Sequence, residues 1–455
     1  MASEAELTRT IADAVLGIDA LWGGDVMSAS GTKRFIADSW FSDEPLPEAY
    51  THPAAAAVRD SEGVAARQPD RQAVDAYLDA VDVRGAITRL AGLAGGLRPR
   101  RRAYLEGVAV GLEVMWDLAM EILGKGEPVP YERCVLASTG APPMPSHPTL
   151  MRERVRELLS AAGHRDSDLL AAAEAWRAER MVPAKAIKAL GQAVIAQFDA
   201  LTVKNVLPHL PRALHGVPRA NVDFLPIEGA WFSGSMNYLG RKRRADGSPE
   251  YEATYEINAA LQISVPEFQQ LVSHEVVPGH VTTVAYYQNL YLRRKLGFEA
   301  TVLTMNTRGA ALMEGVANNA VLFAHGVREP SELPDRDLEL GTLLALLQDE
   351  AKNQSSYLTW KEKVPQPEVA EVLRRDFLCS TERADKLSGA WGRHPLLGRM
   401  YLPCYRAGTQ RVADLRRQYP DDAVLPVVFG CRGLADVVTV TELVQEAARR
   451  PRLGS

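Results

Sequence analysis

The segment 274–280 places two histidines and a glutamate within seven residues, a combination that can bind a divalent metal ion. His274 and Glu275 are adjacent, and His280 follows directly after Pro278 and Gly279. In the common helical zinc motif HExxH, the two histidines are four residues apart and share one helix face. Here the separation is six residues, which on a regular helix turns the side chains about 120° apart. Because proline interrupts a helix and glycine adopts many backbone conformations, a break at this point can bring both histidines to one ion.

The alternative for this segment is a pair of unrelated histidines at a helix end, with His274 acting as a C-terminal cap. The adjacent Glu275, a strand expected upstream and the Pro-Gly break together favour the metal site. Zinc is the expected ion, although two histidines and a carboxylate also suit Mn²⁺ or Fe²⁺.

A third ligand is expected on a later helix, and Glu314 is the candidate. It is an ionisable residue in the otherwise apolar run 310–317, where burial of an unpaired carboxylate would be costly. A metal ion would remove that cost, and so would Arg308 or a hydrogen-bond network. Asn318 lies one turn further on the same face and is expected to orient Glu314. His325 is interpreted as a helix cap. The other histidines show no partner pattern and are interpreted as structural: His52, His147, His164, His209, His215 and His394.

The elements around the motif are predicted from the period of the apolar residues. Alternation predicts a strand over 255–263 with one buried face. Ser264 and Glu267 form a capping box that predicts a helix over 265–277, with His274 in its last turn. A second helix is expected over 280–295, and further helices over 301–324 and 335–360.

The rest of the chain is also predicted to be mainly helical. Helical periods recur over 4–22, 70–95, 102–124, 149–161, 166–179 and 184–204, and again up to 440–450. Dense prolines over 126–148 predict an extended loop, and 208–226 is irregular. The expected fold is mainly α, with a small sheet beside the motif helix. It is divided into a helical lobe over 1–215 and a metal-binding catalytic lobe over 216–455, within one continuous helical fold.

Composition sets limits on the function. The 455 residues are 46% hydrophobic and 24% charged with a net charge of -5, which is ordinary for a globular protein and argues against a nucleic-acid binder. No secretory signal and no membrane span are visible, so a cytoplasmic protein without membrane contact is expected. The four cysteines form no CxxC pair and are interpreted as reduced, packed thiols.

Three segments resemble the bacterial domain-of-unknown-function 885 family of HExxPGH zinc metallopeptidases, of which the chain would be a divergent member. The first is His274–His280, the second is Glu314–Ala317, which reads EG-x-A, and the third is Pro403–Gly408, which is similar to a proline-led segment ending in Tyr-Lys-x-Gly. They lie in the family's order within about 225–415. The resemblance implies a gluzincin-related fold and a metal held by His274, His280 and Glu314.

The same resemblance implies roles for three further residues. Glu275 would be the general base that activates a water molecule. Tyr405 would donate a hydrogen bond to the developing oxyanion. Arg406 stands where the family usually has lysine, and its cation would hold a substrate carboxylate.

Several positions depart from the family pattern. Val281 and Thr283 replace a histidine and a glutamine, and Val321 replaces a second acidic residue. The family's histidine-bearing segment is not recognisable over 344–360. These departures bear on substrate preference more than on metal binding.

Three functions are therefore considered. The first is metal-assisted hydrolysis of an amide bond in a short peptide or amino-acid conjugate, with the strand 255–263 offering an edge to an extended substrate. The second is a tailoring enzyme of small-molecule metabolism that uses the same site for other chemistry. The third is a non-catalytic binding protein on the same scaffold.

Overall fold

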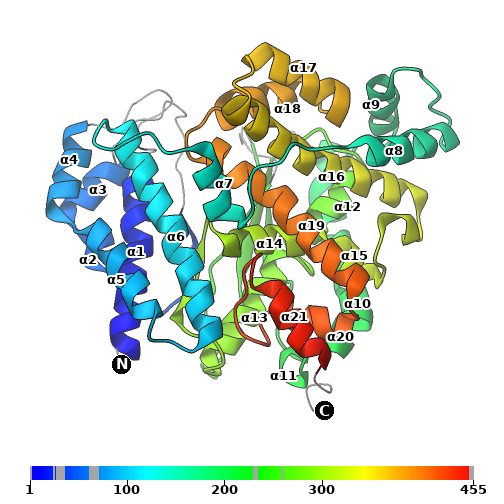
Figure 1. Ribbon diagram of the computed structural model, residues 1–455. Coiled ribbons are helices and arrows are strands. Elements are labelled where there is room, and N and C mark those ends of the chain that lie inside the picture. Colours follow the sequence, from blue (N-terminus) through cyan, green and yellow to red (C-terminus); the bar gives the residue numbers. More distant parts are fainter. Residues whose placement is uncertain are drawn as a thin grey trace.

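Helices dominate the computed structural model, which describes residues 3–23, 26, 36–60, 71–228, 234–258 and 261–449. The described residues form 66% helix and 6% strand, which confirms the mainly helical class predicted from the sequence. Figure 1 shows the N-terminal helices at one side, and the helices of the C-terminal half crossing the centre. Among the described residues, no helix combines the length and the apolar character needed to cross a membrane.

The N-terminal helices pack around a core of their own. Their bounds are α1 (Glu4–Gly23), α2 (Glu48–Thr51), α3 (Pro53–Asp60), α4 (Arg71–Ala80), α5 (Val83–Ala94) and α6 (Pro99–Ile122). The indole of Trp22, at the end of α1, is fully buried and donates to the carbonyl of Met115 on α6. Phe298 and Met400 from the C-terminal half belong to the same hydrophobic cluster, so this core continues into the rest of the molecule.

The middle of the chain adds α7 beside α6, and α8 to α11 on the side away from the N-terminal helices (Figure 1). They are α7 (Tyr131–Thr139), α8 (Thr149–Ala161), α9 (Leu169–Glu179), α10 (Ile187–Asn205) and α11 (Arg212–His215). The prediction of an extended loop over 126–148 was wrong for its central part, because α7 begins directly after Pro130 and uses that proline as its N-cap residue. Val194 and Phe198 of α10 pack in the same cluster as Phe429 near the C-terminus.

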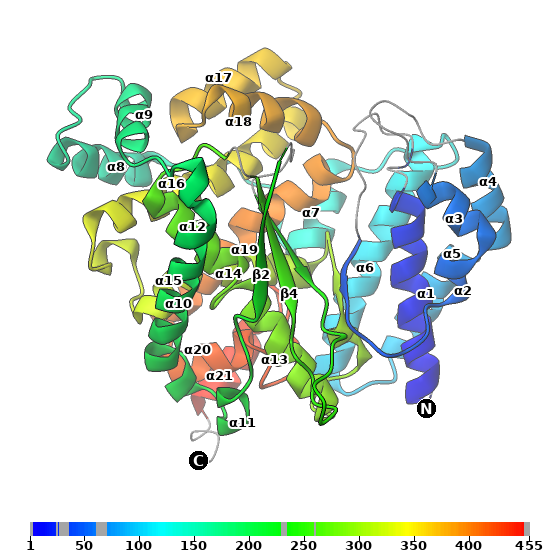
Figure 2. The same cartoon turned by 180° about the vertical axis from the view of Figure 1, so that it is seen from behind.

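A three-stranded sheet lies beside the motif helix, as expected. Its strands β2 (Val222–Ile227), β3 (Gly234–Tyr238) and β4 (Ala253–Asn258) are ordered β2-β4-β3, with β4 parallel to β2 and antiparallel to β3. Tyr255 and Ile257 supply the buried face of β4. The expected strand end at residue 263 was wrong, because residues 261–263 form no strand and Val182 instead binds the Ile263 carbonyl. Figure 2 shows this sheet with α10 to one side and the N-terminal helices to the other.

The motif helix α12 (Val265–Glu275) begins as its capping box predicts. Ser264 accepts from the Glu267 amide and donates to the Glu267 carboxylate at 2.7 Å. The helix ends at Glu275, two residues before the predicted end, because the chain turns through the cis Val277–Pro278 bond. Helix α13 (His280–Leu292) then begins at His280 itself.

The helix predicted over 301–324 is in fact three elements. Residues Val302–Thr304 form β5, which pairs with β1 (Ala37–Trp40), and Thr307 caps α14 (Arg308–Asn318) by accepting from the Ala310 amide. Asn319 separates α14 from α15 (Ala320–His325). The remaining helices are α16 (Arg336–Ser356), α17 (Gln366–Phe377), α18 (Thr381–Lys386), α19 (Leu402–Gln418), α20 (Asp421–Val428) and α21 (Val440–Arg449).

Helices α14 and α19 cross in direct backbone contact. A Cβ atom added at Gly315 would lie 2.3 Å from the carbonyl group of Gly408, and one added at Gly408 would lie 1.7 Å from the carbonyl oxygen of Ala311. The two glycines therefore permit an approach that no other residue type would allow. This contact sets the distance between the side chains that the two helices present to the site.

Candidate metal centre

The break between α12 and α13 brings the two histidines together. His274 lies in the last turn of α12 and His280 is the first residue of α13, and their rings meet edge to face with centroids 4.7 Å apart. The turn requires Gly279, because a Cβ atom there would lie 1.8 Å from the carbonyl oxygen of His274.

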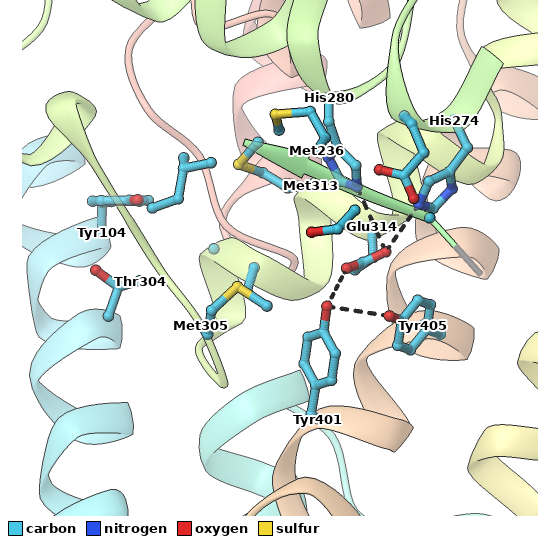
Figure 3. Close-up of a pocket in the computed structure, with 16 residues that line it drawn as sticks. Tyr104, Met236, His274, His280, Thr304, Met305, Met313, Glu314, Tyr401 and Tyr405 are labelled. Carbon is cyan, nitrogen blue, oxygen red and sulfur yellow. Dashed lines mark hydrogen bonds and ion pairs between the residues drawn. The ribbon is translucent and has the colours of Figure 1, made fainter. Parts of the chain in front are cut away.

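Glu314 faces both histidines from α14. Its Oε2 atom lies 3.5 Å from Nε2 of His274 and 3.8 Å from Nε2 of His280 (Figure 3). Ligand atoms around a tetrahedral zinc ion, each about 2 Å from the metal, lie roughly 3.3 Å from one another. The spacing of these three donors thus fits a divalent cation, with only small shifts needed to reach ideal geometry.

The electrostatics of the histidines also suit a metal ion. Burial holds the pKa of His274 well below its ordinary value and lowers the pKa of His280 to about 4, so both imidazoles are neutral near pH 7. Nδ1 of His274 lies 2.7 Å from Oδ1 of Asn318. Because an amide oxygen only accepts, Nδ1 carries the proton and the lone pair of Nε2 points toward Glu314.

Asn318 therefore has a different role from the one predicted. The sequence suggested that it would orient Glu314, but in the structure its amide oxygen accepts a hydrogen bond from Nδ1 of His274. Its amide nitrogen donates to Thr409, and the hydroxyl of Thr409 donates to the carbonyl of Tyr405. This chain of bonds connects the metal-facing imidazole to α19.

A second carboxylate, that of Glu275, lies close to the same two histidines. One ligand atom each from His274, Glu275 and His280 can be chosen so that all lie within 4.8 Å of one another. Glu275 and Glu314 both line the pocket, so two acidic groups flank the histidines. Glu314 lies within 3.8 Å of both Nε2 atoms and Glu275 within 4.8 Å of a ligand atom of each histidine, so either carboxylate can supply the third ligand.

Two tyrosines complete this end of the pocket. Tyr405 lines it as expected, but its hydroxyl donates to the hydroxyl of Tyr401 at 3.1 Å, and Tyr401 in turn donates to Oε1 of Glu314 at 2.6 Å (Figure 3). Burial raises the pKa of both phenols well above the ordinary value, so they remain hydrogen-bond donors. Sequence reasoning missed Tyr401, although its position four residues before Tyr405 was a usable signal.

Arg406 is not brought to the centre. It is absent from the pocket lining, its Nε lies 3.1 Å from the carboxylate of Glu350, and its Nη1 donates to the carbonyl of Met144. The nearest cation behind the tyrosines is instead the buried Lys352, whose Nζ lies 3.2 Å from the centre of the Tyr405 ring and 2.8 Å from Asp349. Sequence reasoning missed Lys352, which is the one lysine of α16.

The positions that depart from the family pattern are buried away from the pocket. Val281 and Val321 belong to the main hydrophobic cluster, and the Thr283 hydroxyl donates to the carbonyl of Gly279. None of the three is among the described residues that line the pocket. His325, predicted to be a cap, ends α15 and packs edge to face on Phe198.

Comparison with known proteins gives structural likenesses only. No family model matches the chain, and no curated protein matches it. The crystal structure of a putative lipoprotein from Colwellia psychrerythraea matches with a TM-score of 0.52 and 14% identity over 83% of this chain and 70% of that one. A putative lipoprotein of unknown function from Shewanella oneidensis matches with a TM-score of 0.51 and 13% identity over 89% and 79% of the two chains.

Metallocarboxypeptidase 1 of Trypanosoma cruzi is a third match, at 13% identity over 99% of this chain and 96% of that one. Its TM-score of 0.33 is too low to carry an argument. The first two likenesses show a shared fold, and at these identities they carry no function. The resemblance to the domain-of-unknown-function 885 family therefore rests on the three sequence segments alone.

Proposed function

We propose that the protein is a metal-dependent hydrolase that cleaves an amide bond in a short peptide or an amino-acid conjugate. The observation that carries the proposal is the convergence of His274, His280 and Glu314, with Glu275 beside them in one pocket. The three converging residues would hold the ion, with zinc as the first choice for two imidazoles and a carboxylate. When bound, such an ion lowers the pKa of water and polarises a carbonyl group.

Glu275 would act as the general base. It directly follows a proposed ligand in the chain and lines the pocket, and its carboxylate would contact the attacking water. It would accept the proton of that water and deliver it to the leaving nitrogen, so that the amide carbon gains a hydroxyl group and the amine leaves neutral.

Tyr401 and Tyr405 would stabilise the negative charge that develops on the carbonyl oxygen once their hydroxyl groups turn from Glu314 and from Tyr401 toward that oxygen. Both phenols line the pocket within one hydrogen-bonded chain that ends on Glu314. Neutral donors aimed at a developing oxyanion are worth several kcal/mol of barrier, on the order of 3 kcal/mol for one donor.

The strand that would align an extended substrate is β3. The sequence suggested the strand at 255–263, but β4 is the central strand, and both of its edges are already paired. β3 is at the sheet edge, and its residues Gly234, Ser235 and Met236 line the pocket. A peptide added to this edge would run past the metal centre.

The test combines metal analysis with one substitution. Protein purified without chelator should contain about one equivalent of zinc, manganese or iron per chain, as expected for a single site. Glu275→Gln should keep that metal and lose activity on a peptide library by roughly 10²–10⁴-fold, because the base is removed and the ligands remain.

Glu127→Gln is the matched control, since Glu127 is exposed and is not among the lining residues of the pocket. Full activity in Glu275→Gln would refute the base assignment. A metal-replete protein that cleaves no member of the library would move the proposal to another reaction at the same site.

A further inference from the structure

The pocket extends beyond the metal centre into a recess with apolar walls. The cavity has a volume of about 170 Å³ and reaches from the histidines to Tyr104 on α6 (Figure 3). Its apolar wall residues are Met236, Leu303, Met305 and Met313. Met236 and Met313 lie beside His280, and Met305 lies on the side toward Thr304 and Tyr104. This apolar recess is not used by any step of the proposed hydrolysis.

We infer that the apolar recess binds an uncharged, apolar side chain of the substrate next to the scissile amide, of branched aliphatic size. The inference rests on the proposed function and names the substrate class of that same site. It makes the four apolar wall residues determinants of specificity.

The distribution of charged residues around the cavity is the first argument for an apolar substrate side chain. Among the described residues that line the cavity, the acids and imidazoles are Glu275, Glu314, His274 and His280, and all four lie at the metal end. No aspartate, lysine or arginine belongs to that lining. A charged substrate side chain in the apolar recess would lose its hydration without gaining a partner, which is costly.

The far end of the recess is also uncharged. Tyr104 closes it, and burial raises the pKa of its phenol above the usual range, so the hydroxyl stays neutral. Arg406, the cation expected to hold a substrate carboxylate, pairs with Glu350 outside the lining. A terminal carboxylate therefore finds no counter-ion among the described lining residues.

The volume of the cavity is the second argument, and it concerns the size of that side chain. A cavity of about 150 Å³ is large enough to bind benzene. Since part of the 170 Å³ here adjoins the metal and must hold the amide group, the remainder is smaller than a benzene-binding cavity, so it suits a branched aliphatic group and excludes a two-ring group. Three of the four wall residues are methionines, whose flexible thioethers adjust to different apolar shapes, so the preference is for a class and not for one side chain.

The first experiment uses hydroxamic acids, which bind a metal ion and carry a variable tail. Calorimetry on the zinc-loaded protein compares acetohydroxamic acid, 4-methylpentanohydroxamic acid, the monohydroxamic acid of succinate and 2-naphthylacetohydroxamic acid. The branched tail should improve affinity over acetohydroxamic acid by at least about tenfold, because several methylene groups leave water. The carboxylate and naphthyl tails should give no gain. Equal or tighter binding of the succinate compound than of the branched one would overturn the inference.

The second experiment fills the recess. Met305→Trp should abolish the gain in affinity of 4-methylpentanohydroxamic acid over acetohydroxamic acid, both measured on the same variant. Met144→Trp is the matched control, because Met144 is 57% exposed and does not line the cavity. An unchanged preference for the branched tail in Met305→Trp would contradict the assignment.

The experiments distinguish a wrong assignment of the recess from a wrong proposed function. If the protein binds zinc and acetohydroxamic acid but does not prefer the branched tail, the hydrolase proposal stands and the recess assignment is wrong. If it holds no metal, the proposed function fails, and the recess is tested by benzene alone. Benzene should raise the melting temperature of the metal-free protein, and Met305→Trp should abolish that rise. No rise in the native protein would overturn the inference independently of the metal.

Discussion

Asn318 determines which nitrogen of His274 faces Glu314. Its amide oxygen accepts from Nδ1, and its amide nitrogen is held by Thr409, so the amide has a defined orientation. This makes Asn318 a positioning residue for the ligand and not for the carboxylate. A partner of this kind keeps the imidazole in the tautomer that can bind a metal.

Replacing Asn318 should therefore weaken metal binding. We expect Asn318→Ala to lower the zinc affinity by roughly 10–100-fold, because the acceptor for Nδ1–H is lost. Asn318→Asp keeps that acceptor and should remain much closer to the native affinity. Competition with a chromophoric chelator measures both, with circular dichroism as a check on folding. Equal zinc affinity of the alanine variant and the native protein would show that Asn318 does not orient the ligand.

At the scale of elements, the site depends on the contact between α14 and α19. Glu314 precedes Gly315 on one helix, and Tyr405 precedes Gly408 by three residues on the other. This crossing explains why the segments Glu314–Ala317 and Pro403–Gly408 each contain a glycine. Gly315 and Gly408 are the points of backbone contact, and each lies in the same segment as a site residue. Separation of the helices would move the carboxylate away from Tyr401, which binds it, and from Tyr405, which binds Tyr401.

A methyl group at the crossing should disturb both stability and metal binding. Gly408→Ala places a Cβ atom against the backbone of Ala311, and we expect a loss of about 1–3 kcal/mol or more in the free energy of unfolding, as for other overpacked cores. Zinc affinity should fall in the same variant, because Glu314 shifts. Urea unfolding and the chelator assay measure the two effects.

Gly92→Ala is the matched control for this substitution. Gly92 lies inside α5, and a Cβ atom there meets nothing within 4 Å. That variant should be neutral or more stable by about 0.5–1 kcal/mol, because alanine favours helix. If Gly408→Ala behaves like the control, the close crossing is not required.

The sequence predicted those parts of the site that depend on local rules. The Pro-Gly break was recognisable because a helix cannot pass it, and the capping box at Ser264 marked the start of α12 correctly. The helix predicted over 301–324 was wrong because β5 is a strand only through its pairing with β1, a contact that no local pattern reveals. Lys352 was missed for the same reason, since its proximity to the centre is set by how α16 packs against α19, whereas Tyr401, at the end of the helical turn Leu397–Tyr401 before α19, could have been inferred from its spacing from Tyr405.

At the scale of the whole molecule, the pocket is built from both ends of the chain. Tyr104 comes from α6, and Leu303 lies on β5, which is held by β1 near the N-terminus. The two largest hydrophobic clusters also mix early and late residues, as Phe298 and Met400 do among the N-terminal helices. The N-terminal helices therefore contribute to the wall of the pocket as well as to the core.

The same extensive burial predicts how the four cysteines behave. Burial raises the pKa of the thiols of Cys134, Cys404 and Cys431 to about 12 and that of Cys379 to about 11, from an ordinary value of 9.0. Because only the thiolate is nucleophilic, the reactive fraction at pH 8 is lower by roughly a hundredfold to a thousandfold than in an exposed cysteine. The folded protein should therefore react very slowly with Ellman's reagent at pH 8, whereas protein unfolded in urea should release four equivalents.

The raised pKa of the thiols also means that their stabilising effect is complete below pH 9 and is lost as the pH rises toward 11–12. The free energy of unfolding should therefore decline over that range. Rapid reaction of even one thiol in the native protein would show that the packing around it is looser than the structure indicates.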